Sequence, residues 1–227
     1  MSQSSIIDPI LFNPASIDPE TAAFNQKIEK ELSGMPPLYK FEPQDIRDAR
    51  AAGYSIFGPI KHLEEAHDRM VPGPAGDIPI RVFIPDKASG VYMHIHGGGF
   101  MLGSADQQDE FLFEICRTCQ VAVVSVGYRL APENPYPSAP DDCETVAVWL
   151  AENSGAEFGT GNLVIGGESA GANLSLFMHM RWLAAGSKSE LAVYPGGIHA
   201  FNFFPIELAR KANTSINDFI IRAMADE

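Results

Sequence analysis

The segment from Asn162 to Gly171, Asn-Leu-Val-Ile-Gly-Gly-Glu-Ser-Ala-Gly, constrains the fold more than any other part of the chain. The apolar run Leu163 to Ile165 predicts a buried strand, and the residues after Ser169 are typical of a helix. A side chain at so tight a turn crowds the backbone two residues before and after it, and those positions are Gly167 and Gly171. This G-x-S-x-G pattern after an apolar strand predicts a nucleophile elbow, which holds a serine hydroxyl above the carboxyl edge of a sheet.

Length and charge limit the class of protein. A chain of 227 residues is long enough for one sizeable core, so we expect one main domain. Its formal charge of -13 at pH 7 would repel phosphate backbones and anionic lipids, so we expect no nucleic-acid or membrane partner. The sequence contains no apolar run near the roughly 18 residues of a membrane span and no secretion signal at its polar start, and we expect a cytoplasmic protein.

The three cysteines do not predict a metal or a disulfide framework. Cys116 and Cys119 form a C-x-x-C, but a structural zinc site would need a second pair of ligands at matching spacing, and the sequence has none. An odd count without a secretion signal argues against disulfides. We therefore expect no metal and no cofactor, and two thiols carried by a helix.

Two amphipathic helices are predicted ahead of the first strand. One begins at Asp18-Pro19 and stops at Gly34, and the other runs from Pro43 to Gly53. They indicate an N-terminal helical lid over residues 1–55, followed by a core domain over 56–227. The alternative that these helices only cover a sheet edge stays open.

The rest of the chain alternates between strands and helices. We expect two strands around the turn Pro72 to Gly76, and then further strands and helices in this order: a strand over 90–96, a helix over 106–119, a strand over 121–126 and a helix over 140–151. This alternation predicts an α/β fold with a mostly parallel sheet covered on both faces.

A glycine-rich loop follows the strand that ends at His96. Consecutive glycines from Gly97 to Gly99 let backbone N–H groups point at one spot, where they could hold an oxyanion. His96 itself is expected to shape this loop through hydrogen bonds rather than to act as a base. By strand alternation, His94 faces the same side of the sheet.

Four segments in this order resemble one protein family. They are His96 to Gly99, Tyr128 to Glu133, Gly167 to Gly171 and Tyr194 to Phe201. Together they resemble the hormone-sensitive-lipase branch of the alpha/beta-hydrolase superfamily, the bacterial esterases with an HGGG motif, over nearly the whole chain. The resemblance implies an alpha/beta-hydrolase fold and a carboxylic ester hydrolase for small, short-acyl esters that works through an acyl-enzyme.

The resemblance also implies roles for individual residues. Ser169 would be the nucleophile and His199 the general base, and the N–H groups of Gly97, Gly98 and Ala170 would form the oxyanion hole. Arg129 and Glu133 match positions that brace a turn. The expected partner is a small-molecule ester, and a homodimer stays open.

The acid of the catalytic triad is not found in this chain. In the family it lies between the serine and the histidine, but His199 follows Ser169 by only 30 positions, with Glu190 as the sole carboxylate between them. Glu190 would begin a strand running to Tyr194, which at about 3.3 Å per residue places it ~13 Å from the active-site edge. The helices before and after Ser175 resemble two separate family helices joined together, so the segment after the nucleophile helix is predicted to be shortened near residue 175.

The missing acid leaves three hypotheses. The first is a serine carboxylesterase impaired by its absence, since spoiling the aspartate of a serine protease lowers kcat about 10⁴-fold. The second is a small-molecule binding or receptor-like protein on a crippled hydrolase fold. The third is an inactive truncated form, with exposed apolar surface or an unpaired edge beside Leu163 to Ile165.

Overall fold

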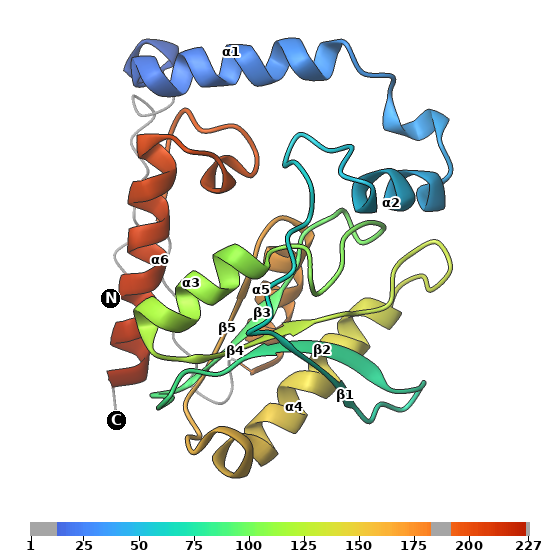
Figure 1. The fold of residues 1–227 in the computed structure, drawn as a ribbon, viewed down its shortest axis with the longest axis vertical. Helices are drawn as coiled ribbons and strands as arrows, with labels where there is room; N and C mark the ends of the chain where they lie inside the picture. The colour runs from blue at the N-terminus through green and yellow to red at the C-terminus, as the bar shows by residue number, and fades with distance from the viewer. Residues whose placement is uncertain (1–12, 183–191, 226–227) are drawn as a thin grey trace. The chain divides into compact units, whose positions relative to one another are not determined.

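The computed structural model describes residues 13–182 and 192–225 (Figure 1). These residues divide into two compact units. Of these residues, 13–40 and 192–216 form the first unit, and 41–182 and 217–225 form the second.

The second unit is built on a sheet of five strands. They are β1 (His67–Val71), β2 (Ile78–Phe83), β3 (Val91–Ile95), β4 (Ala122–Val126) and β5 (Leu163–Gly167), in the order β1-β2-β4-β3-β5. The strands β4, β3 and β5 run parallel, because a helix separates each from the next along the chain. The hairpin strands β1 and β2 are antiparallel to each other, and β2 is antiparallel to β4. The predicted mostly parallel α/β sheet is therefore confirmed at its centre, with an antiparallel hairpin at one side.

Helices cover both faces of this sheet (Figure 1). The helices α4 (Ser138–Phe158) and α5 (Ala170–Trp182) pack on one face, against inward side chains such as Met93 and Ile95. The helix α3 (Asp109–Cys119) and the end of α6 (Glu207–Ala225) pack on the other face, around Tyr92 and Val123. Apolar residues on both faces of β3 and β4 produce this two-sided burial.

The strand β5, which leads to Ser169, is the last strand on its side of the described sheet. All five of its residues are half-buried, whereas every residue of β3 and β4 is buried. Within the described residues β5 is thus less covered than β3 and β4, and the exposed side beside Leu163 to Ile165 stays a prediction. The helix α5 follows without a break through Ser175, whose Oγ donates to the carbonyl oxygen of Gly171 at 2.8 Å.

The first unit combines the helix α1 (Pro19–Ser33) with the segment that contains His199. The carboxylate of Asp18 accepts from the N–H of Glu20 and caps the helix, as its sequence predicts. The rings of Phe24 and Phe204 pack with centroids 4.8 Å apart, and Asn25 Nδ2 donates to the carbonyl oxygen of Gly196 at 2.7 Å. The N-terminal helix therefore holds the turn that precedes His199.

Helix boundaries lie within a few residues of the predicted ones, except that α4 continues past residue 151 to Phe158. The helix α2 (Pro43–Ala51) lies in the second unit, and short 3-10 turns occupy Pro14–Ser16, Leu38–Lys40 and Phe201–Phe203. The strand predicted before Tyr194 is absent from its described part, since residues 192–194 have no regular secondary structure. Among the described residues, none of the helices has both the length and the apolar character to cross a membrane.

Candidate active site

Ser169 lies at the turn between β5 and α5. Its φ of +55° is in the left-handed region, which costs energy for any residue with a Cβ atom. Its side chain is exposed at the carboxyl end of β5. A strained serine between a strand and a helix is typical of a nucleophile elbow, because the strain lifts the hydroxyl clear of the backbone.

The two flanking glycines are required by close contact with the end of β3. A Cβ atom at Gly167 would lie 2.1 Å from the carbonyl oxygen of Ile95, and one at Gly171 would lie 1.8 Å from the same oxygen. Both distances are far shorter than van der Waals contact. The crowding predicted from the sequence is therefore present, and the crowding group is the neighbouring backbone.

The glycine loop after β3 lies directly against the elbow. A Cβ atom at Gly97 would be 2.9 Å from the carbonyl oxygen of Glu168 and 3.2 Å from the Cβ of Ser169. Gly98 and Gly99 have φ values of +134° and +63°, which favour glycine. The loop thus approaches Ser169 with bare backbone.

The N–H groups around Ser169 differ in what they bind. The N–H of Gly97 donates to Oε1 of Glu168 at 3.2 Å. Within the described part of the chain, the N–H groups of Gly98 and Gly99 have no acceptor. Ala170 is the first residue of α5, so its N–H has no acceptor inside the helix. Of the three predicted donors, Gly97 is the one already engaged, and Gly99 is a further candidate that the motif did not single out.

A buried polar chain lies beneath this loop. His94 Nε2 is 2.9 Å from Oε2 of Glu168, and His94 Nδ1 is 3.0 Å from Oγ of Ser125. His94 and Ser125 are 1% and 0% exposed, so these contacts exclude water. Burial would raise the pKa of Glu168, but His94 and the hydrogen bonds from Gln108 and Gly97 outweigh burial and hold this pKa below its ordinary value.

Sequence reasoning missed Glu168, although two signals pointed to it. A residue next to a strained serine must point away from the serine hydroxyl, and a carboxylate pointing inward needs partners. His94, two positions before His96 on β3, faces the same side of the sheet and supplies one. The pairing itself joins positions 74 residues apart, which no local pattern reveals.

His96 shapes the glycine loop, as expected. It is buried, its Nδ1 donates to the carbonyl oxygen of Gly97 at 2.9 Å, and its ring stacks on Tyr128 with centroids 4.2 Å apart. The hydroxyl of Tyr128 donates to the carbonyl oxygen of His96 at 2.9 Å. Burial lowers the pKa of His96 to about 4, so the imidazole is neutral at pH 7.

The segment Tyr128 to Glu133 is held by two arginines. Arg129 pairs with the buried Asp142 of α4 at 2.8 Å. The carboxylate of Glu133 accepts two hydrogen bonds from the guanidinium of Arg47 in α2, at 2.9 Å each. Both residues therefore brace the turn, in agreement with the sequence prediction.

His199 lies in the first unit, whereas Ser169 lies in the second. It follows the turn at Gly196, where a Cβ atom would be 2.9 Å from Ile17 and where φ is +87°. The meeting of His199 and Ser169 stays a prediction. Glu190, the sole carboxylate between them, lies outside the described residues, and the triad acid stays unassigned.

Metal or thiol chemistry has no support in the described residues. Searched over 13–182 and 192–225, the chain brings no three His, Cys, Asp or Glu side chains together as a metal site. Cys116 and Cys119 are buried on α3, and burial raises the pKa of each thiol to about 11. Thiols with so high a pKa are poor nucleophiles at pH 7.

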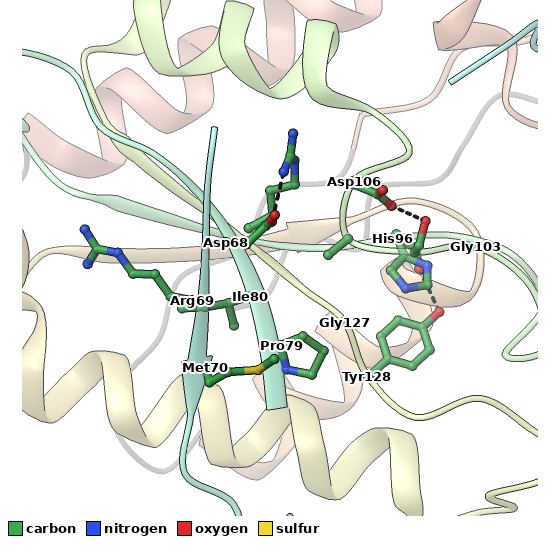
Figure 2. A pocket seen from close by; sticks show the side chains of 13 residues that line it. Asp68, Arg69, Met70, Pro79, Ile80, His96, Gly103, Asp106, Gly127 and Tyr128 are labelled. Atoms are coloured by element: carbon green, nitrogen blue, oxygen red, sulfur yellow. Dashed lines mark hydrogen bonds and ion pairs between the residues drawn. The ribbon is translucent and has the colours of Figure 1, made fainter. Parts of the chain in front are cut away.

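A cavity of about 520 Å³ lies beside the glycine loop (Figure 2). Its walls come from β1, β2, the loop 103–106 and Tyr128, and Ser169 is not among its lining residues. Its charged groups have partners within the protein: Asp68 pairs with Arg81 at 2.9 Å, and Asp106 contacts His62 at 2.8 Å. The cavity is therefore separate from the elbow.

Comparison with known proteins agrees with this geometry. Residues 92–199 match the family model of the alpha/beta-hydrolase fold. The carboxylic ester hydrolase LipN of Mycobacterium tuberculosis is 41% identical over 130 residues, which are 56% of this chain and 34% of LipN. An arylesterase of Saccharolobus solfataricus is 34% identical over 162 residues, 70% of this chain and 52% of that protein. The chain therefore spans about a third to a half of these relatives.

A solved structure extends the likeness in fold. The hyperthermophilic esterase of the archaeon Pyrobaculum calidifontis superposes with a TM-score of 0.77 at 20% identity, over 91% of this chain and 98% of that one. A mixed sheet between helices, with a strained serine after a strand, is typical of the alpha/beta-hydrolase fold. The chain therefore has the alpha/beta-hydrolase fold, and its relatives support the resemblance to hormone-sensitive-lipase-like esterases.

Proposed function

We propose that this protein hydrolyses small carboxylic esters with short acyl groups, with Ser169 as the nucleophile. The observation that carries the proposal is the φ of +55° at Ser169, on a turn packed against the glycine loop through Gly97. A strained, exposed hydroxyl beside backbone N–H groups that have no acceptor among the described residues is suited to acyl transfer. The relatives that are named as esterases support the same class of reaction.

In the proposed mechanism the hydroxyl of Ser169 attacks the ester carbonyl carbon while His199 accepts the hydroxyl proton. The tetrahedral intermediate collapses, the C–O bond to the alcohol breaks, and His199 returns the proton to the leaving alcohol. Water then attacks the acyl-enzyme with His199 again as the base. Ser169 and a carboxylic acid are released. This scheme requires His199 to reach Ser169 during turnover.

The oxyanion would be held by backbone N–H groups of Gly98 and Ala170. Gly99 is a third donor on the same argument, since its N–H has no acceptor in the described chain. Gly97, whose N–H donates to Glu168, would contribute to the hole only by exchanging that partner. Each well-placed donor lowers the barrier by about 3 kcal/mol in a dry site.

The test is hydrolysis of p-nitrophenyl acetate by the wild type and by Ser169→Ala. Losing the nucleophile should lower kcat by about 10³-fold or more. If no carboxylate supports His199, deacylation is slow and an acetyl adduct accumulates. Intact-mass spectrometry should then find the adduct on the wild type and not on Ser169→Ala.

The control is Ser89→Ala, which removes another hydroxyl, one that donates to the carbonyl oxygen of Gln120. It should hydrolyse the ester at the wild-type rate. The hydrolase proposal fails if Ser169→Ala and the wild type release p-nitrophenol equally fast. His199→Ala should lower the rate of adduct formation, and an unchanged rate would exclude His199 as the base.

A further inference from the structure

The carboxylate of Glu168 joins the two parts of the proposed site. One oxygen, Oε1, accepts from the N–H of Gly97 in the glycine loop at 3.2 Å. The other, Oε2, is 2.9 Å from His94 Nε2 on β3. Glu168 is itself the residue before Ser169, so one side chain connects the elbow, the loop and the sheet.

The proton positions along this chain follow from the charge of Glu168. Because its pKa is lowered, the carboxyl is ionised at neutral pH and can only accept hydrogen bonds. His94 Nε2 must then carry a proton. In the neutral imidazole Nδ1 is an acceptor, and it faces the hydroxyl of the buried Ser125 at 3.0 Å. Glu168, His94 and Ser125 are thus each hydrogen-bonded within this network, and a buried polar network needs such pairing in order to be stable.

Gly97 is held at both of its backbone polar groups. Its N–H donates to Glu168, and its carbonyl oxygen accepts from His96 Nδ1 at 2.9 Å. The next residue, Gly98, has a φ of +134°, and a Cβ atom there would be 2.0 Å from the carbonyl oxygen of Leu102. Fixing the peptide of Gly97 therefore fixes the direction in which the N–H of Gly98 points.

We infer that Glu168 is a positioning residue, which locks the glycine loop against the elbow so that the N–H groups of Gly98 and Gly99 face the reacting carbonyl. The inference rests on the proposed function and deepens it. Glu168 does not touch substrate, because its oxygens are occupied by Gly97 and His94 and its side chain is only 17% exposed.

Two substitutions distinguish a positioning role of Glu168 from an effect of its negative charge. Glu168→Ala removes the acceptor for Gly97 and should let the loop move. Glu168→Gln keeps an oxygen for the N–H of Gly97, and its amide can donate to His94 Nε2 if the imidazole proton moves to Nδ1 and donates to Ser125. The neutral variant should therefore rescue the loop, which a purely electrostatic role for the carboxylate does not allow.

The first measurement is amide hydrogen exchange at Gly97, with the amide of Met93 in β3 as an internal reference. Glu168→Ala should exchange at Gly97 about ten-fold faster or more relative to Met93, and Glu168→Gln should stay within about three-fold of the wild type. The second is ester hydrolysis. Misdirected oxyanion donors lower kcat rather than binding, so Glu168→Ala should lose about ten-fold or more in kcat with KM within two-fold.

Asp142→Asn is the matched control, since Asp142 is a buried carboxylate paired with Arg129 in the same unit. It should leave the exchange of Gly97 relative to Met93 unchanged. If Glu168→Ala does not fold, Glu168→Asp replaces it, because a side chain shorter by one methylene cannot reach both partners and should give the same result.

Unchanged exchange at Gly97 in Glu168→Ala, or an equal effect of Asp142→Asn, would overturn the inference. Both outcomes can be read without turnover. They are therefore distinct from failure of the proposed function, which is judged by Ser169→Ala alone.

Discussion

Gly171 is the residue at which the elbow tolerates no side chain. A Cβ atom there would lie 1.8 Å from the carbonyl oxygen of Ile95, and this oxygen belongs to the backbone of a buried strand that cannot move aside. We expect Gly171→Ala to lower the free energy of unfolding by about 2 kcal/mol or more and to displace Ser169. Urea unfolding followed by circular dichroism measures the first effect, and the rate of ester hydrolysis measures the second.

Gly155 provides a control of opposite sign. It lies inside α4, and a Cβ atom there would meet nothing within 4 Å. Gly155→Ala should therefore raise the free energy of unfolding by about 0.5 to 1 kcal/mol, because alanine loses less backbone entropy in a helix. Equal destabilisation by both alanines would show that contact with Ile95 does not explain the requirement at Gly171.

At the residue scale the sequence predicts steric requirements better than polar partners. Gly167, Ser169 and Gly171 lie two positions apart, so their spacing reveals the requirement for glycine, although not the carbonyl oxygen of Ile95 that imposes it. The partners of Glu168 are not local, since His94 lies 74 positions away. Strand alternation placed His94 on the correct face of β3. Alternation predicts the face on which a side chain lies, but not which residue it contacts there.

The helix α2 is attached to the glycine loop and the adjoining turn through one arginine. Arg47 Nε donates to the carbonyl oxygen of Met101, and Nη2 donates to that of Ala131. The guanidinium also pairs with Glu133. The Arg47 side chain is only 18% exposed, so these bonds are partly shielded from water. The planar guanidinium of arginine presents several N–H donors in fixed directions, whereas the ammonium of a lysine could not bind all of these acceptors at once.

We expect Arg47→Gln to lower the free energy of unfolding by about 1 to 2 kcal/mol and to raise the exchange rates of the α2 amides, since several hydrogen bonds are lost together. Lys61→Gln removes one positive charge from an ion pair with Glu110 in which both side chains are about 60% exposed. It should change the free energy by less than about 0.5 kcal/mol. The role assigned to Arg47 would be wrong if the two variants behaved alike in urea unfolding.

Element types were predictable because apolar periodicity and turn residues are local. The hairpin around Pro72 to Gly76 and the strands β3 and β4 occupy the expected positions. The end of α4 could not be predicted in this way. The helix continues to Phe158, and Gly159, with a φ of +76°, ends it. Leu150, Ser154 and Phe158 are buried on its inner face, so tertiary packing extends the helix past the predicted end.

At the scale of the whole molecule, the compact units do not follow the order of the chain. The first unit combines residues 13–40 with 192–216, through contacts such as Asn25 to Gly196, 171 positions apart. The sequence placed a lid over residues 1–55 because composition and periodicity describe contiguous segments. That lid and its boundary stay predictions. The long-range contacts of α1 could not be predicted from patterns within one continuous segment of the sequence.

Stability of the whole molecule should depend on pH through the buried His96. Its pKa is lowered to about 4 in the folded protein, against about 6.5 in an unfolded chain. Between these values the unfolded chain binds a proton that the folded protein does not. Stability is therefore full above pH 6.5 and is lost as pH falls toward about 4, by about 3 kcal/mol from this group.

The contribution of Glu168 to the free energy of unfolding changes with pH in the same direction as that of His96. Its pKa is lowered on folding, so its contribution is present above its unfolded pKa of 4.5 and is lost as pH falls below that value. The fall between pH 6.5 and about 4.5 consequently belongs to His96, and the two groups can be separated by their windows.

Urea unfolding at a series of pH values between 4.5 and 7 tests the contribution of His96. In His96→Asn an amide takes the place of Nδ1–H, so the bond to the carbonyl oxygen of Gly97 can form, but the side chain does not titrate. This variant should be less stable at pH 7, because it loses the stacking on Tyr128, and should lose less stability as the pH falls. His67→Asn, at an exposed position of β1, leaves the buried imidazole in place and should keep the wild-type slope. A His96→Asn slope as steep as that of the wild type would mean that acid sensitivity arises elsewhere in the protein.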